Sequence, residues 1–259
     1  MSGKNIRLAR LFGNDGRALI VALDHGRRHG PIPGIKNLGK TLKEIVKAEV
    51  DGIMMTPAMI SRYWDIVKDI FLIARIDGTG TVKSLDETDD RLIASVLFAV
   101  KKGADAVSVM VYPGSINEQF LWEKLSIVVE EAENIGIPVL AEVVPKPPVF
   151  ENKFDPYAIA YGSRIAAEIG ADIIKTLYTE NFGEIVESTP VPIVILGGEK
   201  TSSPTDILEI VEKAVKEGAA GAAIGRNIFQ HENPLGMARA LMAIIHEGLK
   251  ASEAAESFL

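Results

Sequence analysis

Eight short apolar runs, each followed by a helical or loop segment, are the feature of this 259-residue sequence that most limits its fold. Most are continuous runs rich in Val and Ile, as expected of strands buried on both faces of a parallel sheet. They begin roughly 20 to 35 residues apart, the repeat that βα units require. The predicted strands are Ala18–Asp24, Asp51–Thr56, Phe71–Asp77, Ala104–Tyr112, Pro138–Val144, Ala171–Tyr178, Val191–Gly198 and Gly221–Gly225. We therefore predict an α/β fold, a (β/α)₈ TIM barrel with residues 1–259 in a single domain.

The segments between these strands place apolar residues three and four positions apart, which is the pattern of amphipathic helices. The predicted helices are Lys40–Glu49, Leu92–Gly103, Glu118–Ile135, Ala158–Gly170, Thr205–Gly218 and Pro234–Gly248. We expect Asn5–Leu11 to form a short helix that closes the barrel floor, and Ala251–Leu259 to form a tail that packs on a neighbouring subunit. The Pro-rich segment Pro145–Pro156 is predicted to be a long loop within the one domain.

Charge and composition exclude several classes of function. The formal net charge is −7 and no block of Lys and Arg stands out, which argues against a nucleic-acid partner. The sequence has no Cys, so disulfides, thiolate catalysis and Cys-ligated metals are excluded. No apolar run reaches the ~18 residues of a membrane span, and Met1–Arg10 lacks the pattern of a signal peptide. We expect a cytoplasmic protein without a membrane or nucleic-acid partner.

Lys175 is the most informative candidate for chemistry. Active sites of this fold lie at the carboxyl ends of the strands, and Lys175 lies late in the sixth predicted strand, within Ile173–Leu177. If its side chain faces the barrel axis, burial disfavours the ammonium form and lowers the pKa. A neutral amine can attack a carbonyl carbon and form an imine. The alternative from the pattern alone is a structural ion pair with a barrel carboxylate.

Asp24 and His25 follow the first predicted strand. An aspartate at the barrel mouth can hold the lysine or transfer protons near an imine, although Asp is also common as a cap of the following loop. The pairing with Lys175 favours the functional interpretation. We expect His25 to orient Asp24 or the loop. Because no His and carboxylate residues stand at metal-ligand spacing, we predict no metal and no other cofactor.

Two glycine-containing strand ends indicate an anion site. Gly197 and Gly198 end the seventh predicted strand, and Gly225 with Arg226 ends the eighth. Loops after strands seven and eight often bind phosphate in this fold. Glycines let the backbone approach an anion, and Arg adds charge-assisted hydrogen bonds. Lys200, beside Thr201, is expected to assist. Glycines at barrel turns are also common for turn geometry alone, but the two glycine-containing strand ends together with Arg226 favour a phosphate site.

Three further polar residues are predicted to face the barrel interior. Arg75 and Asp77 share a face of the third strand, and Glu142 lies on the fifth. Buried charges need partners, because an unpaired one costs several kcal/mol. These residues are therefore either a structural cluster or contacts to a second phosphate or to substrate hydroxyls.

The motifs resemble, in order along essentially the whole chain, those of the archaeal-type class I fructose-bisphosphate aldolases. This superfamily also contains 2-amino-3,7-dideoxy-D-threo-hept-6-ulosonate synthase and the autoinducer-2 phosphate thiolase. The matching segments are Leu23–Gly26, Tyr112–Ser115, Ala171–Thr176, Tyr178–Thr179, Gly197–Gly198, Lys200–Thr201 and Gly225–Gln230.

The resemblance implies a TIM barrel in which Lys175 forms a Schiff base and Asp24 supports the lysine and proton transfer. It implies that the phosphate of a dihydroxyacetone-phosphate unit binds at Gly197, Gly198, Gly225 and Arg226. The partner is then a small phosphorylated sugar such as fructose 1,6-bisphosphate. The resemblance also implies a homo-oligomer, which in this superfamily is often a decamer.

One position departs from the superfamily pattern. These aldolases place an acid/base tyrosine at the end of strand five, directly before a proline, where this sequence has Val144 before Pro145. Valine cannot transfer a proton. Glu142 lies two residues earlier on the same strand face, and we expect it to take over part of the acid/base role.

Other functions remain open at this point. A related enzyme could keep the lysine and change the partner, as a transaldolase-like synthase of aromatic precursor biosynthesis or as a thiolase. A phosphosugar isomerase or epimerase would use acid/base groups without an imine. A non-catalytic sugar-phosphate binder is the third alternative, suggested by Val144.

Overall fold

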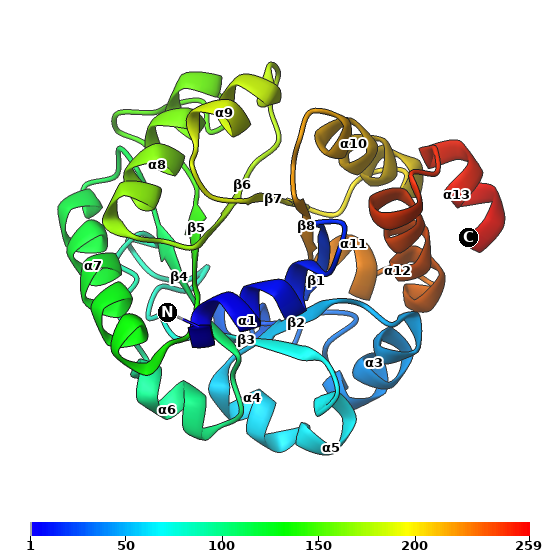
Figure 1. Cartoon of the computed structure of the whole chain (residues 1–259), viewed down its shortest axis with the longest axis horizontal. Helices are drawn as coiled ribbons and strands as arrows, with labels where there is room; N and C mark the ends of the chain where they lie inside the picture. The colour runs from blue at the N-terminus through cyan, green and yellow to red at the C-terminus, as the bar shows by residue number, and fades with distance from the viewer. Residues whose placement is uncertain (1) are drawn as a thin grey trace.

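A closed barrel of eight parallel strands forms the centre of the protein in the computed structural model, which describes residues 2–259. The strands pair in sequence order, and β8 closes on β1 with Ala18 opposite Gly221. Figure 1 shows the helices as a ring around this barrel. The strands are β1 (Ala18–Ala22), β2 (Gly52–Met55), β3 (Phe71–Arg75), β4 (Ala106–Val111), β5 (Val139–Val143), β6 (Ile173–Thr176), β7 (Ile193–Leu196) and β8 (Gly221–Ile224). The predicted single-domain (β/α)₈ barrel is confirmed.

Helices follow most strands and pack outside the barrel. The helices up to β5 are α1 (Ser2–Phe12), α2 (Gly26–His29), α3 (Leu38–Ile45), η1 (Val46–Ala48), α4 (Pro57–Arg62), α5 (Trp64–Val67), α6 (Val96–Lys101) and α7 (Glu118–Ile135). The later helices are α8 (Pro156–Ile169), α9 (Phe182–Ser188), α10 (Pro204–Lys216), α11 (Arg226–Phe229), α12 (Pro234–Met242), η2 (Ala243–Glu247) and α13 (Ala251–Phe258). None of the helices within residues 2–259 combines the length and the apolarity of a membrane span.

The barrel interior changes from apolar to charged along the strands. Its lower layers are a cluster of buried aliphatic side chains that includes Ile20, Ile73 and Ile173. Two residues further along each of these strands stand Ala22, Arg75 and Lys175. Because alternate residues of a strand face the same side, the upper end of the interior holds the charged groups.

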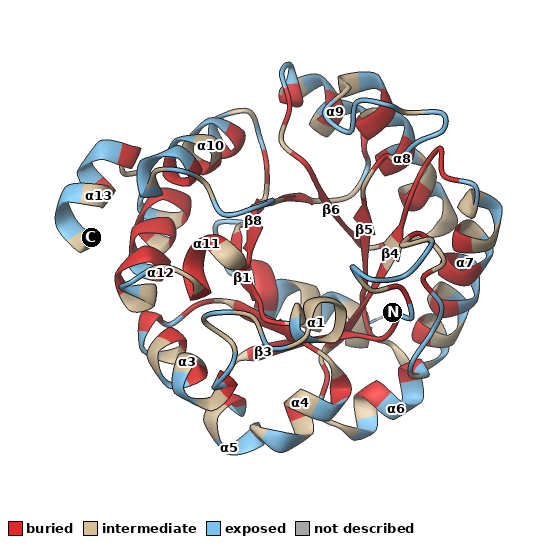
Figure 2. Cartoon of the chain, turned by 180° about the vertical axis from the view of Figure 1, so that it is seen from behind, coloured by how far each residue is buried: buried red, intermediate tan, exposed pale blue. Residues whose placement is uncertain are grey.

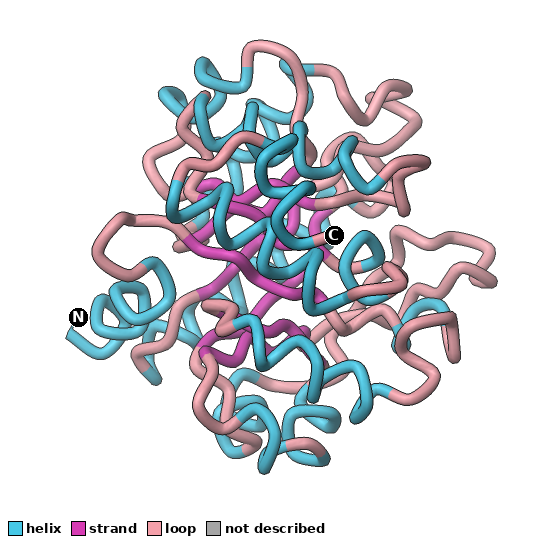
Figure 3. Tube along the Cα trace, turned by 90° about the vertical axis from the view of Figure 1, so that its right-hand side faces the viewer, coloured by secondary structure: helices cyan, strands magenta, loops and turns pink. Residues whose placement is uncertain are grey.

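Helix α1 closes the apolar end of the barrel, as predicted. Leu11 and Phe12 at its end are buried and belong to the same cluster as the lower barrel layers. Figure 1 shows α1 lying across the barrel opening, and Figure 3 shows the N-terminus at one end of the molecule. The site must therefore open at the opposite end.

A second, larger core lies between the strands and the surrounding helices. Figure 2 shows that the strands are almost entirely buried and that the helices alternate buried and exposed positions. Helix α10 is an example, since Ile207, Leu208 and Val211 are buried against the barrel while Glu209 is exposed. Burial on both faces explains why the strands read as continuous apolar runs.

The helix predicted over Leu92–Gly103 is shorter than expected. It covers only Val96–Lys101, because the Ser95 hydroxyl caps its first turn by accepting from the amide of Phe98. The residues before it belong to the loop after β3, where Leu92 forms an antiparallel bridge with Asp77. The apolar pattern of Leu92–Gly103 runs through both the end of this loop and the helix, which explains why the helix was predicted to be too long.

The end of the chain also differs from the prediction. The helix predicted over Pro234–Gly248 is α-helical to Met242 and continues as a π-helix. The predicted tail is the helix α13, which packs on α10 and α12 of its own chain. Its buried Ala251 and Ala254 make this close packing feasible.

Candidate active site

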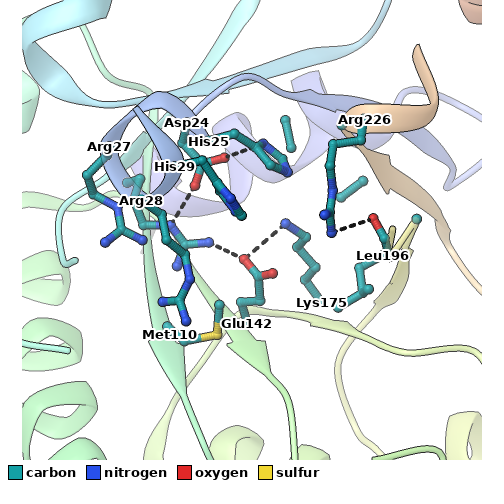
Figure 4. A pocket seen from close by; sticks show the side chains of 16 residues that line it. Asp24, His25, Arg27, Arg28, His29, Met110, Glu142, Lys175, Leu196 and Arg226 are labelled. Atoms are coloured by element: carbon teal, nitrogen blue, oxygen red, sulfur yellow. Dashed lines mark hydrogen bonds and ion pairs between the residues drawn. The ribbon is translucent and has the colours of Figure 1, made fainter. Parts of the chain in front are cut away.

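A cavity of about 180 Å³ lies at the open end of the barrel and is lined by charged side chains. Figure 4 shows Lys175 and Glu142 rising from neighbouring strands, with Asp24 and His25 on one side and Arg226 on the other. The lining residues are Ala22, Asp24, His25, Arg27, Arg28, His29, Arg75, Met110, Glu142, Lys175, Leu196, Gly197, Gly198, Ala223, Gly225 and Arg226. Most of the predicted site residues therefore come together here.

Lys175 is a buried lysine whose amine reaches this cavity. It lies in β6 and is 4% exposed, and the register of β5 and β6 sets it directly opposite Glu142. Its Nζ donates to Glu142 Oε2 at 2.9 Å. The ion pair that the sequence left as an alternative therefore exists, and it forms inside the cavity.

Glu142 links the amine to the rest of the charged cluster. The same Oε2 also accepts from Arg75 Nη2 in a very short contact. Burial alone would raise the pKa of Glu142, but the positive charges of Lys175 and Arg75 outweigh burial and hold that pKa below its ordinary value. Glu142 is therefore an ionised carboxylate in hydrogen-bond contact with the amine.

Asp24 follows β1 and faces the cavity, but its closest cation is not the lysine. Arg75 Nε donates to Asp24 Oδ2 at 3.0 Å, and hydrogen bonds connect Asp24 to Lys175 through Arg75 and Glu142. The role of Asp24 in supporting the lysine and proton transfer stays a prediction. Burial raises the pKa of Asp24, whereas the neighbouring positive charges, that of Arg75 first, lower it more strongly, and the net shift is downward.

Arg75 is the central residue of the buried cluster. Its side chain is 2% exposed, and its three nitrogens contact Asp24, Glu142 and, at 3.4 Å, Asp77. Asp77 in turn accepts from Lys124 at 2.6 Å. Of the two interpretations left open by the sequence, the geometry favours the structural one, because the guanidinium is already engaged by protein carboxylates.

His25 is a neutral neighbour of Asp24. Its Nδ1 lies 3.6 Å from Asp24 Oδ1 without forming a hydrogen bond, and its ring contacts the Phe229 ring edge-on at 5.1 Å. Burial lowers the pKa of His25 to about 4, despite the opposing charge of Asp24. The imidazole is therefore uncharged at neutral pH.

The two glycine-containing turns, at Gly197–Gly198 and at Gly225, both line this cavity. Arg226 Nη2 donates to the Gly198 carbonyl at 3.0 Å, and its buried Nε has no hydrogen-bond partner within residues 2–259. Gly198 has a φ of 63°, which favours glycine. A side chain at Gly225 would clash with the His25 ring. The unpartnered Nε–H of Arg226, beside glycines that have no side chain, is suited to binding an anion.

Lys200 does not join this group, contrary to expectation. Its Nζ donates to the Gln230 carbonyl at 2.9 Å, and it lines a separate surface pocket with Thr201. The amide of Thr201 donates to Asn227 Oδ1, which turns the loop after β7 outward. The loop conformation thus separates Lys200 from the glycines that precede it in sequence.

The basic turn after β1 was not predicted to be part of the site. Arg27, Arg28 and His29 of helix α2 line the cavity together with Asp24 and His25. Arg28 donates to Glu87 at 2.6 Å and to the Tyr112 hydroxyl at 3.1 Å. The run Arg27–His29, directly after a strand end, was the available signal.

Val144 lies beyond the end of β5 and is half-buried against the outer core. It is absent from the lining of the cavity, whereas Glu142, two residues earlier, is part of it.

In the part of the chain that the structure describes, no three His, Asp or Glu side chains are grouped as metal ligands would be.

Comparison with known proteins identifies the family. The sequence profile described as "DeoC/LacD family aldolase" matches residues 18–231. The chain is 35% identical to an uncharacterized aldolase of Saccharolobus solfataricus, with 98% of each chain covered. It is 33% identical to 2-amino-3,7-dideoxy-D-threo-hept-6-ulosonate synthase of Halobacterium salinarum, covering 95% of this chain and 92% of the relative.

A solved structure extends the similarity to three dimensions. An archaeal fructose-1,6-bisphosphate aldolase, with its catalytic Lys covalently bound to the carbinolamine intermediate of the substrate, superposes with a TM-score of 0.86 at 31% identity. The match covers 93% of this chain and 98% of that structure. The barrel, the matched segment and these relatives agree, and the chain is an enzyme that belongs to the DeoC/LacD family of aldolases.

Proposed function

We propose that the protein is a class I aldolase in which Lys175 forms a Schiff base with a phosphorylated ketose. The observation that carries this proposal is the position of the Lys175 amine, which is buried at the cavity wall in contact with Glu142. Lys175 is the lysine of the cavity lining. Its burial keeps water away from the bond that an imine must form.

The pair of Glu142 and Lys175 also supplies a route for the first proton. An ammonium cannot attack a carbonyl, so Lys175 must give a proton to a neighbouring base, and Glu142 Oε2 is 2.9 Å away. The neutral amine then adds to the ketone carbon, and the carbinolamine loses water to form the imine. Protonated Glu142 can return its proton to the departing hydroxyl.

The imine then acts as an electron sink for bond cleavage. A base removes the proton of the C4 hydroxyl, and the C3–C4 bond breaks. The C4 part leaves as an aldehyde, and the electron pair of the broken bond moves into the iminium group to form an enamine. Protonation of the enamine at C3 and hydrolysis of the imine release dihydroxyacetone phosphate and restore Lys175. We assign the proton transfers to Glu142, with Asp24 and Arg75 keeping the carboxylate in place.

The phosphate of the substrate is assigned to Gly197, Gly198, Gly225 and Arg226. The unpartnered Nε of Arg226 and the position of the three glycines in the cavity lining support this assignment. Binding the phosphate there holds the ketone near the amine, and such positioning lowers the barrier by removing the entropy cost of encounter.

Fructose 1,6-bisphosphate is the first substrate that we propose. The second is the donor of a transaldolase-like synthase, because a relative at 33% identity is 2-amino-3,7-dideoxy-D-threo-hept-6-ulosonate synthase and Val144 replaces the tyrosine of the aldolase pattern. Product analysis with several aldehyde acceptors separates the two candidates.

Activity of a lysine variant tests the proposal. We expect Lys175→Met to lose aldol cleavage of every phosphorylated ketose that the wild type accepts, by at least about 10⁴-fold, because no imine can form. Lys213→Met, on the exposed side of α10, is the matched control and should keep full activity. Retained cleavage in Lys175→Met would overturn the proposed function.

A further inference from the structure

A second cavity lies on the far side of the turn that joins β1 to α2. Its volume is about 590 Å³, and Asp24 and Arg27 line both this cavity and the active-site cavity. Leu23 is part of the second cavity only, as expected from the alternation of side chains along a strand. An occupant would therefore touch the catalytic turn from outside the barrel.

The walls of the second cavity are mainly apolar. Leu23 and Leu38 are buried at its base, whereas Ile93 and Phe98 are 46% and 45% exposed. A cavity of this size with apolar walls and few polar groups is the usual form of a site for small organic molecules. Ile93 and Phe98 would lose contact with water if such a molecule were bound.

The charged residues of this lining determine which charge a bound molecule should carry. They are Asp24, Arg27 and Lys36, and Asp24 is already paired with Arg75 at 3.0 Å. Arg27 donates to the Gly80 carbonyl and is ion-paired with Asp90 at 3.6 Å, but its buried Nε has no hydrogen-bond partner among the described residues. Both nearby carboxylates are thus already paired with an arginine, so the unpartnered Nε of Arg27 and the exposed Lys36 favour an anionic group.

We propose that the second cavity is an effector site for a small amphipathic carboxylate. The apolar body, an aromatic ring or a branched aliphatic chain, packs on Leu23 and Phe98. The carboxylate lies toward Arg27 and Lys36. This ligand is chemically unlike a phosphorylated sugar, so the site is separate from the substrate site.

A continuous series of contacts connects this site to the amine. Asp24 accepts from Arg75, Arg75 donates to Glu142, and Glu142 accepts from Lys175 at 2.9 Å. A ligand that moves the turn carrying Asp24 and Arg27 therefore changes the partners of the amine. By linkage, such a ligand and the substrate must alter each other's affinity by the same factor.

Calorimetric titration of the full chain with phenylacetate and with its neutral isostere phenylacetamide tests the site. We expect saturable binding of phenylacetate and at least about fivefold weaker binding of the amide. Ala58→Trp, at an exposed position of the lining, should fill the cavity and abolish binding. Lys36→Gln should weaken binding by about two- to fivefold, whereas Lys43→Gln, an exposed change on the helix α3 that follows Lys36, should leave it unchanged.

The rate of imine trapping by borohydride tests the connection to the active site. Phenylacetate should change the rate in the wild type and leave it unchanged in Ala58→Trp. No binding of phenylacetate, equal binding of the amide, or binding that Ala58→Trp does not affect would overturn the site. Binding without any change in trapping would overturn its effector role. A wild type that traps no substrate at all would count against the proposed function, while the titration would still decide the site.

Discussion

Glu142 is the residue on which the proposed chemistry depends after the lysine itself. It is opposite Lys175 in the strand register and accepts a hydrogen bond from the amine at 2.9 Å. The aldolase pattern would have a tyrosine two positions later, where Val144 lies outside the cavity lining. A carboxylate in contact with the amine can both take and return a proton, whereas valine can do neither.

Glu142→Gln should therefore lower kcat by about 10²-fold or more, because the amide keeps the shape but cannot accept a proton. Steady-state cleavage of the preferred phosphorylated ketose measures the effect. Glu118→Gln, on α7 away from the cavity, is the matched control. Circular dichroism should accompany both, because the change also leaves Lys175 and Arg75 with a weaker partner. An unchanged kcat in folded Glu142→Gln would remove the acid/base role.

Arg226→Gln should raise KM for phosphorylated substrates by about 10- to 100-fold, the usual value of a lost charge-assisted hydrogen bond. Its side chain borders the glycines at the ends of β7 and β8. Dephosphorylated substrates should be affected much less. Arg164→Gln, an exposed change on α8, serves as control. Equal losses for phosphorylated and unphosphorylated substrates would contradict the assignment of the phosphate.

The sequence identified most residues of the site but not the contacts that they make with one another. Lys175 and Glu142 could be placed because each is polar within an apolar strand and their spacing fixes the face. The partner of Asp24 could not be predicted, because three strands bring Arg75, Glu142 and Lys175 within reach. Lys200 was misplaced because the loop after β7 turns toward Asn227.

The strands were the elements most easily predicted. Their burial on both faces leaves a continuous apolar signal, and eight such runs are enough to specify the barrel. Short helices such as α4 and α9 were missed, because six or seven residues give little periodicity. Part of the loop between β3 and α6 was predicted to be helical. In the structure this loop is anchored by ion pairs of Asp77 with Lys124 and of Asp90 with Arg27.

The π-helix η2 contains a pH-sensitive contact on the opposite side from the active site. His246 contacts Asp15 at 2.7 Å and Asp51 at 3.0 Å. The hydrogen bond with Asp51 is the main cause that raises the pKa of His246 to about 9, against the effect of burial. The contact therefore stabilises the fold fully below the unfolded pKa near 6.5, and this contribution is lost as pH rises through about 9.

His246→Gln should be less stable than the wild type at pH 6, and the difference should shrink as pH approaches 10. Urea unfolding of both proteins across this range measures the difference in the free energy of unfolding. Because His246 is absent from the cavity lining and contacts Asp15 and Asp51, which precede β1 and β2, kcat should not change. A difference that is constant with pH would show that the ion pairs do not govern this contribution.

The two ends of the barrel have different roles, one in stabilising the fold and the other in the proposed chemistry. One end of the barrel is filled by aliphatic side chains and closed by α1, and the other holds Arg75, Glu142 and Lys175. This division keeps the charged groups supported by a rigid apolar base, so that their positions are fixed before substrate binds. The sequence could predict this polarity, because β3, β5 and β6 carry Arg75, Glu142 and Lys175 near their ends, after aliphatic residues.

Borohydride reduction in the presence of a phosphorylated ketose tests the central claim most directly. The reagent converts an imine into a stable amine, and mass spectrometry of the digested protein identifies the modified residue. The account predicts one covalent adduct per chain, on Lys175, that is absent without borohydride and absent in Lys175→Met. An adduct on a peptide without Lys175, or cleavage of the ketose without any adduct, would contradict it.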